Sequence, residues 1–249
     1  MNICVFDTET IGIDKPFCYN IGYVIVDTNT WKFLLSRSYV VEQIWHNLPL
    51  FKTAYYADKR SIYVNEMRSR KTIMSKYGYI CQQMIRDFDS FQIENAYAFN
   101  SSFDERVFDF NCDWFKCNNP FDTVKIHDIR AFAIKYLVDD DYKLFCDTNG
   151  LYTESGNYST TAETFYKYIS SNTAFIESHT ALEDSLIETE ILYSSISNGA
   201  KLEEEIIAPK SVEKIVAKEL QVIARDKTEH TFPYNKIRIN KEKTKIILH

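Results

Sequence analysis

Apolar residues in the first 41 positions fall into short runs separated by polar turns, which is the pattern of β-strands. Runs at 3–6, 21–26 and 33–41 predict three strands. The polar residues at 27–30, Asp-Thr-Asn-Thr, have turn chemistry, so the last two strands are expected to form a hairpin. The chain therefore opens with a three-strand meander.

Beyond residue 41 the apolar spacing becomes helical. Residues 42–64 show no clean period and predict a loop with a short helix. Asn65 can cap a helix over 66–88, because apolar side chains recur there every three to four residues. The later pattern predicts a strand at 96–99, a helical turn at 103–108, an apolar patch at 124–126, and helices at about 129–137, 160–170 and 181–198.

Strands interleaved with helices predict an α/β domain whose mixed sheet is covered by helices. The pattern changes near Gly199, where a helix-like stretch at 212–224 is followed by β-prone stretches at 237–239 and 246–248. We therefore divide the chain into an α/β domain over 1–198 and a basic C-terminal appendage over 199–249.

Net charge is distributed unevenly along the 249 residues. The formal charge is −6, which by itself argues against a polyanionic partner. Residues 209–249 carry ten Lys/Arg against five Asp/Glu, so residues 1–208 carry −11. An acidic body can still bind a polyanion if bound cations cancel its charge locally. Metal ions therefore belong to any nucleic-acid hypothesis for this chain.

Cysteine and hydropathy patterns exclude several other classes. The six Cys include no CxxC pair, so reduced structural thiols are favoured over a zinc ribbon or a disulfide framework. No apolar run approaches membrane-spanning length, and Asp7 interrupts the N-terminus before a signal peptide could form. We expect a cytoplasmic protein without a membrane partner.

The first candidate site follows the first predicted strand, in Asp7-Thr8-Glu9. Alternate side chains of an extended chain point the same way, so Asp7 and Glu9 face one site. Two adjacent carboxylates repel unless a cation lies between them, and Mg²⁺ or Mn²⁺ prefers oxygen ligands. By itself the pair is better explained as a solvated strand end with ordinary acidic residues.

The second candidate follows the strand at 96–99. Asn100 and Asp104 directly follow the carboxyl end of this strand, which is where ligands bind in α/β sheets. Alone, they are also explained as a turn residue and a carboxylate at a helix start.

The third candidate precedes the helix at 181–198. Thr180 and Glu183 form a capping-box pattern, which places His179 just outside the helix and Asp184 in its first turn. A loop histidine and a helix-dipole partner are the ordinary alternative.

Together the three segments, DxE, NxxFD and HxALxD, resemble the DEDDh branch of the 3′–5′ exonucleases over residues 1–198. The branch includes ribonuclease T, oligoribonuclease and the proofreading subunit of bacterial replicative polymerase. Family members most often have His before the Asn of the second motif, where this chain has Phe99. The small size and the tail also resemble stand-alone exonucleases of phages and prophages, which would place the protein in a host cytoplasm.

The resemblance implies a ribonuclease H-like fold with a mixed five-stranded sheet and release of nucleoside 5′-monophosphates from 3′ ends. It implies two divalent cations, Mg²⁺ or Mn²⁺. Asp7 would be shared by both cations, with Glu9 and Asp184 completing one site and Asp104 contributing to the other. It further implies His179 as general base, and contacts with the terminal nucleotides from Thr8, Asn100 and Phe103.

The expected partner is a single strand or 3′ end of DNA or RNA, and a homodimer or a replication partner stays open. A substrate groove is predicted from basic and aromatic residues, with a solvated helix face as the alternative; these residues are Lys59, Arg60, Arg68, Arg70, Lys71, Tyr55, Tyr56 and Tyr63. Two other functions remain alternatives: an inert nuclease-fold module that binds a polymerase or nucleic acid, and a hydrolase of small nucleotides.

Overall fold

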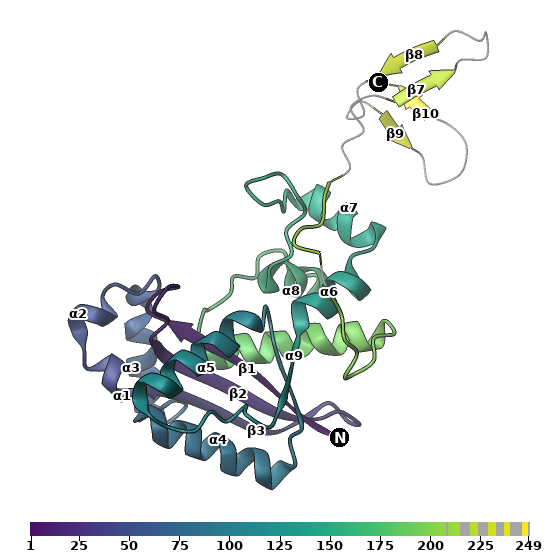
Figure 1. The fold of residues 1–249 in the computed structure, drawn as a ribbon. Helices are drawn as coiled ribbons and strands as arrows, with labels where there is room; N and C mark the ends of the chain where they lie inside the picture. Colours follow the sequence, from purple (N-terminus) through teal and green to yellow (C-terminus); the bar gives the residue numbers. More distant parts are fainter. Residues whose placement is uncertain (208, 215–219, 224–228, 233–236, 240–245, 249) are drawn as a thin grey trace. The chain divides into compact units, whose positions relative to one another are not determined.

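The computed structural model describes residues 1–207, 209–214, 220–223, 229–232, 237–239 and 246–248. Contacts divide the chain into two units, Met1–Val212 and Glu213–His249, which are described separately. The first unit is built on one six-stranded sheet (Figure 1). Its strands are β1 (Asn2–Thr10), β2 (Cys18–Asp27), β3 (Lys32–Val41), β4 (Ile73–Ser75), β5 (Asn95–Ala98) and β6 (Lys125–Asp128).

The sheet has the order β4-β3-β2-β1-β5-β6. The first three strands pair antiparallel as a meander, whereas β4, β5 and β6 each run parallel to the neighbour they join. The predicted meander and mixed sheet are confirmed. The sheet has one strand more than predicted, because β4 adds to the outer edge of β3.

The single helix predicted over 66–88 is wrong. Helix α3 (Arg60–Arg68) contains Asn65 in its interior, and α4 (Tyr77–Phe91) starts only after β4. Between them the backbone turns at Arg70, which has a left-handed φ of 62°, and the carbonyl of Glu66 accepts the N–H groups of Lys71 and Thr72. The three- to four-residue spacing of apolar side chains continues through β4, but the pairing of β4 with β3 overrides this helical pattern.

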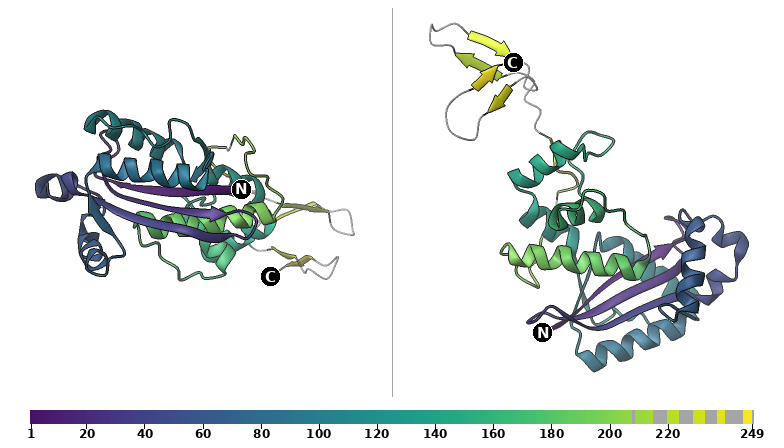
Figure 2. Two further views of the ribbon diagram at one scale, coloured as in Figure 1. Left: turned by 90° about the horizontal axis from the view of Figure 1, so that it is seen from below. Right: turned by 180° about the vertical axis from the view of Figure 1, so that it is seen from behind.

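Alternate side chains of β1 point into two separate cores. Ile3 and Val5 pack in one apolar cluster with residues of α6 (Ile129–Leu137), α7 (Asp140–Asn149), α8 (Ala162–Ser170) and α9 (Ala181–Ser197). Cys4 and Phe6 pack in the other with residues of α4 and α5 (Ser102–Phe115). Figures 1 and 2 show α4 and α9 on opposite faces of the sheet. The remaining helices are α1 (Glu42–Trp45), α2 (Leu48–Phe51) and η1 (Ala57–Lys59).

The second unit contains two antiparallel pairs among its described residues, β7 (Leu220–Ile223) with β8 (Glu229–Phe232) and β9 (Ile237–Ile239) with β10 (Ile246–Leu248). The two predicted β-prone stretches are thus confirmed. The helix predicted over 212–224 is wrong at β7, and its residues 215–219 and 224 lie outside the described residues.

Residues 199–207 and 209–212 belong by contacts to the first unit, and the domain division after residue 198 stays a prediction. Among the described residues, every helix is too short or too polar to cross a lipid bilayer.

Candidate active site

Strand β1 distributes its polar end between the two faces of the sheet. Asp7 and Glu9 continue the face of Ile3 and Val5, because side chains alternate along a strand, and both line a hollow of about 700 Å³. Thr8 lies between them on the other face, where its hydroxyl donates to Oδ1 of Asp104 at 2.6 Å. The DxE spacing therefore supplies two carboxylates to one side and a hydrogen-bond donor to the other.

Helix α9 reaches this site because Gly22 lets its first turn lie directly on β2. Gly22 pairs with Asp7 in the sheet, and a Cβ at Gly22 would lie 2.1 Å from the carbonyl carbon of Ala181. Asn20 accepts the N–H of Ala181 at 2.9 Å, and the hydroxyl of Ser185 donates to the carbonyl of Gly22 at 3.1 Å. Such contacts between α9 and the strand fix the first turn of the helix beside Asp7. Asp184 stands on this turn and lines the same hollow.

Asp104 comes from the opposite layer, in the first turn of α5. Strands β1 and β5 are parallel, so their carboxyl ends meet at one edge of the sheet and deliver Asp7 and Asp104 to the same place. Asn100 connects β5 to α5 with a left-handed φ of 59°, and its N–H donates to Asp128 at 2.9 Å. Asn100 lines the hollow, whereas Phe103 packs against the α4/α5 core.

The four predicted carboxylates are brought together and are strongly desolvated. Burial, with the neighbouring carboxylates adding to it, raises the pKa of Glu9 to about 8 and that of Asp184 to about 9. Burial also raises the pKa of Asp104 to about 7 and holds that of Asp7 well above its usual range. Each carboxylate thus costs free energy when ionised without a positive partner.

Sequence reasoning missed two further carboxylates in the hollow, Glu177 and Glu188. Glu188 is one helical turn after Asp184 and accepts the N–H of Phe99 at 3.2 Å. Burial first, and then Asp104, raises the pKa of Glu188 well above its usual value. Burial likewise raises the pKa of Glu177 to about 7. The i, i+4 spacing from Asp184 was the available signal for Glu188.

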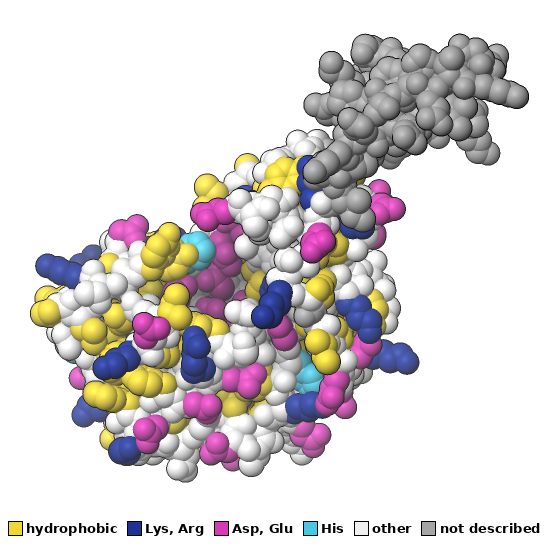
Figure 3. Space-filling view, turned by 45° about the horizontal axis from the view of Figure 1, so that its top comes forward, with side chains coloured by type: hydrophobic (Ala, Val, Ile, Leu, Met, Phe, Trp, Pro, Cys, Tyr) yellow, Lys and Arg dark blue, Asp and Glu magenta, His cyan; other side chains and the backbone are white. Residues whose placement is uncertain are grey.

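The donor set of this hollow fits divalent cations. Among the described residues, Oδ1 of Asp184 is the one buried side-chain oxygen or nitrogen without a hydrogen-bond partner. Glu9, His179 and Asp184 each offer a ligand atom, and these atoms lie within 4.8 Å of one another. Figure 3 shows acidic side chains gathered in a recess with a histidine at its rim. Clustered oxygen donors with an unsatisfied carboxylate oxygen are the surroundings that Mg²⁺ and Mn²⁺ require.

His179 is held at the rim of the hollow by the segment around η1. The ring of Tyr56 stacks on the imidazole at 4.2 Å between centroids, and Nζ of Lys59 donates to the carbonyl of Ser178 at 2.5 Å. The backbone of His179 is left-handed at φ 53°. Burial, and then the positive charge of Lys59, lowers the pKa of His179 below 6.5. The imidazole is therefore neutral at pH 7.

Helix α9 begins after Thr180 as predicted, but the predicted capping box is not formed. Thr180 makes no side-chain capping hydrogen bond, and its hydroxyl lies 3.1 Å from that of Ser178. Glu183 instead accepts from Lys71 at 2.7 Å. The first turn of α9 is thus tied to the turn before β4.

The predicted basic and aromatic groove is only partly formed. Tyr56 and Lys59 lie beside His179, but Tyr63 is fully buried. The Arg60 guanidinium stacks over Trp45 at 3.7 Å, so it is engaged in packing. The positively charged side chains that line the hollow are instead those of Arg130 and Lys210, which were not part of the predicted groove.

Comparison with family models gave no match, and comparison with curated proteins gave none either. Solved structures of 3′ exonucleases are similar. The nuclease domain of 3′hExo, a DEDDh family member bound to rAMP, has a TM-score of 0.57 at 14% identity, over 83% of this chain and 97% of that domain. A full-length 3′-exonuclease has a TM-score of 0.56 at 13% identity, over 87% of this chain and 67% of that one.

Escherichia coli exonuclease I in complex with a dT13 oligonucleotide has a TM-score of 0.50 at 12% identity, over 80% of this chain. The matched part is 41% of the exonuclease I chain, so this chain spans well under half of that enzyme's length. At such identities the similarity concerns the fold. The ribonuclease H-like fold predicted from the sequence is confirmed.

Proposed function

We propose that this protein is a metal-dependent exonuclease that hydrolyses nucleic acid from the 3′ end and releases nucleoside 5′-monophosphates. The observation that carries the proposal is the meeting of Asp7, Glu9 and Asp184 in one hollow with His179 at its rim, and of Asp104 close enough to Asp7 to raise its pKa. These five residues come from three separated segments and from both faces of the sheet. The fold shared with 3′ exonucleases adds support.

The carboxylates divide into two sets of cation ligands. Asp7 is central, because burial and then the charges of Asp104, Glu188, Asp184 and Glu9 all raise its pKa. We assign Glu9 and Asp184 to one cation and Asp104 to the second, with Asp7 shared between them. Divalent cations held by these carboxylates would supply Lewis acidity at the scissile phosphate. Glu188 is not one of these ligands, and once cations are bound its carboxylate would add negative charge near Asp104 and Asp184.

His179 acts as general base. Its neutral imidazole accepts the proton of the attacking water, and a base whose pKa lies near the working pH is suited to that transfer. The stacked Tyr56 ring limits rotation of the imidazole, and Lys59 anchors the adjoining backbone. The conjugate imidazolium then lies 3.9 Å from Oε2 of Glu177, where the carboxylate can stabilise it.

The 3′-terminal nucleotides are assigned to the rest of the hollow. Asn100 lines the hollow and keeps its predicted role as a contact to these nucleotides. The contacts predicted from Thr8 and Phe103 would have to come from outside this lining, because the Thr8 hydroxyl donates to Asp104 and Phe103 packs against the α4/α5 core. Arg130 and Lys210 line the hollow and offer positive charge to phosphates beyond the carboxylates. DNA and RNA both remain candidate substrates, and the similar structures carry rAMP in one case and dT13 in another.

The test is digestion of single-stranded DNA and RNA oligomers with Mg²⁺, Mn²⁺ or EDTA. Wild type should release mononucleotides with either cation and none in EDTA. Asp184→Asn is the matched variant, since it keeps the shape of the side chain and removes its charge. Equal turnover of this variant and wild type in saturating Mg²⁺ would contradict the assignment of Asp184. Absence of mononucleotide release from both polymers would contradict the proposed function.

A further inference from the structure

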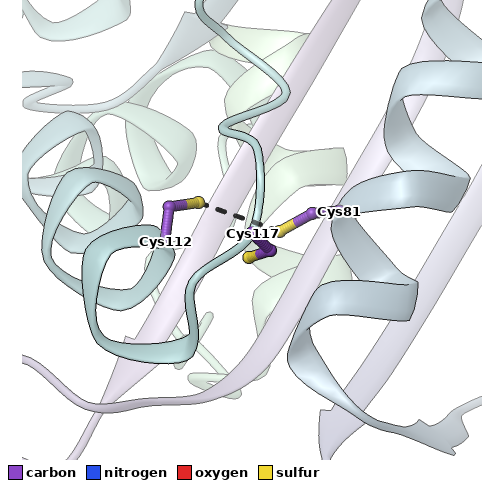
Figure 4. A group of neighbouring side chains, drawn as sticks. All are labelled: Cys81, Cys112 and Cys117. Carbon is purple, nitrogen blue, oxygen red and sulfur yellow. Dashed lines mark hydrogen bonds between the residues drawn. The ribbon is translucent and has the colours of Figure 1, made fainter.

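A second cluster of potential ligands lies away from the hollow, on the α4/α5 side of the sheet. Cys81 is on α4, Cys112 is near the end of α5, and Cys117 follows α5 (Figure 4). The chain reverses at Lys116, which has a left-handed φ of 54°, and the N–H of Cys117 donates to the carbonyl of Cys112 at 3.1 Å. This reversal brings two cysteines, five positions apart in the sequence, to the same point.

The three sulfurs are already near the spacing of a metal site. They lie within 4.8 Å of one another, and Sγ of Cys81 is 4.0 Å from Sγ of Cys112. Tetrahedral zinc with bonds of about 2.3 Å to sulfur requires sulfurs about 3.8 Å apart. Side-chain movements of about 1 Å or less would therefore complete the geometry.

The surroundings give access to a fourth ligand. A depression of about 390 Å³ beside the sulfurs is lined by Cys112, Cys117 and three carboxylates, those of Asp109, Asp113 and Asp122. One Lys also lines it, so the depression is net acidic and attracts cations. Cys117 is only half-buried, whereas Cys81 and Cys112 are buried, so the cluster opens to solvent on one side.

We propose that Cys81, Cys112 and Cys117 form a zinc site with three thiolate ligands and a water from the depression. Zinc binding displaces three thiol protons to solvent, and no oxidant or reductant is needed. Because cysteine binds zinc as the thiolate, binding strengthens as the pH rises. The bound ion would join α4 to the end of α5, the helix whose first turn carries Asp104. The site is independent of the proposed nuclease activity.

The test uses the full chain, reduced and freed of metal, titrated with Co²⁺ and then with Zn²⁺. Thiolate ligands give Co²⁺ an intense charge-transfer absorption in the near ultraviolet, which carboxylate and imidazole ligands do not. One equivalent of Co²⁺ should develop this absorption in wild type and in Asp184→Asn, and Zn²⁺ should abolish it by displacement. Cys117→Ser should lose most of the absorption, whereas Cys146→Ser, a buried cysteine outside the cluster, should retain it.

Two results would overturn the zinc site. One is a wild-type chain without charge-transfer absorption while mass spectrometry confirms six free thiols. The other is an absorption of equal strength in wild type and Cys117→Ser, which would place the ligands elsewhere. Cys117 is the least buried of the three, so its substitution by Ser is compatible with folding, and a circular dichroism spectrum checks this.

Discussion

Replacement of Gly22 by Ala should inactivate the protein without touching any of the proposed catalytic groups. The new Cβ would lie 2.1 Å from the carbonyl carbon of Ala181, whereas ordinary contacts begin at 3.4 Å. The first turn of α9 must therefore move away from β2 by about 1.3 Å, and Asp184 moves with it. A misplacement of about 1 Å in a catalytic site costs on the order of 10²-fold in rate. Overpacking of this kind also destabilises by about 1–3 kcal/mol.

The assay compares turnover on a labelled oligonucleotide and the melting temperature for Gly22→Ala, Gly78→Ala and wild type. Gly78, in the first turn of α4, is the matched control, because its added Cβ would lie 3.5 Å from Cβ of Cys117, which is an ordinary contact distance. Ala should stabilise that helix by about 0.5–1 kcal/mol and leave turnover unchanged. Wild-type turnover and melting temperature in Gly22→Ala would refute the account of how α9 is positioned.

Three further changes test individual groups. Asp184→Asn should raise the melting temperature in EDTA at pH 8. The pKa of Asp184 is raised to about 9 in the folded protein, so the folded state binds more protons than the unfolded state and wild-type stability falls as the pH rises from about 4 to 9. If the melting temperature of Asp184→Asn exceeds that of wild type by as much at pH 4 as at pH 8, the raised pKa of Asp184 is not the cause of the difference. His179→Ala should lower turnover by about 10²–10⁴-fold and remove the acid limb of the pH–rate profile, which should lie below pH 6.5 because the pKa of His179 is lowered. The Mn²⁺ affinity of His179→Ala should stay near that of wild type. If His179→Ala instead loses as much Mn²⁺ affinity as Asp184→Asn does, His179 is a metal ligand. Glu188→Gln should weaken Mn²⁺ binding by several-fold while preserving the hydrogen bond from Phe99, and unchanged affinity would limit Glu188 to a structural role.

Sequence reasoning found the motif-bearing parts of the fold because their information is local. Asp7 and Glu9 at a strand end and Asp184 in a first helical turn are consequences of short-range periodicity, and the structure brings them together. The edge strand β4 was missed because helical periodicity continues through it, and only its pairing with β3 reveals the break.

Other features depend on contacts between distant segments. A glycine in a strand interior, such as Gly22, is typical of a close approach of backbone, but the sequence does not identify Ala181 as the residue that approaches. The three cysteines of the zinc proposal have no regular spacing, because one comes from α4 and the other two from a chain reversal after α5. Glu177 and Glu188 carry no motif of their own, and their place in the hollow follows from the packing of α9 on the sheet.

The direction of attack tests the central claim most directly. A single-stranded oligonucleotide labelled at its 5′ end should shorten one nucleotide at a time in Mg²⁺, and a 3′-phosphate should block it whereas a 5′-phosphate should not. A closed single-stranded circle should remain intact. The proposed site binds a 3′ terminus beside Thr8 and Glu9, and a closed circle has no terminus. Cutting of the circle, or internal fragments appearing before the one-nucleotide ladder, would contradict the 3′–5′ exonuclease.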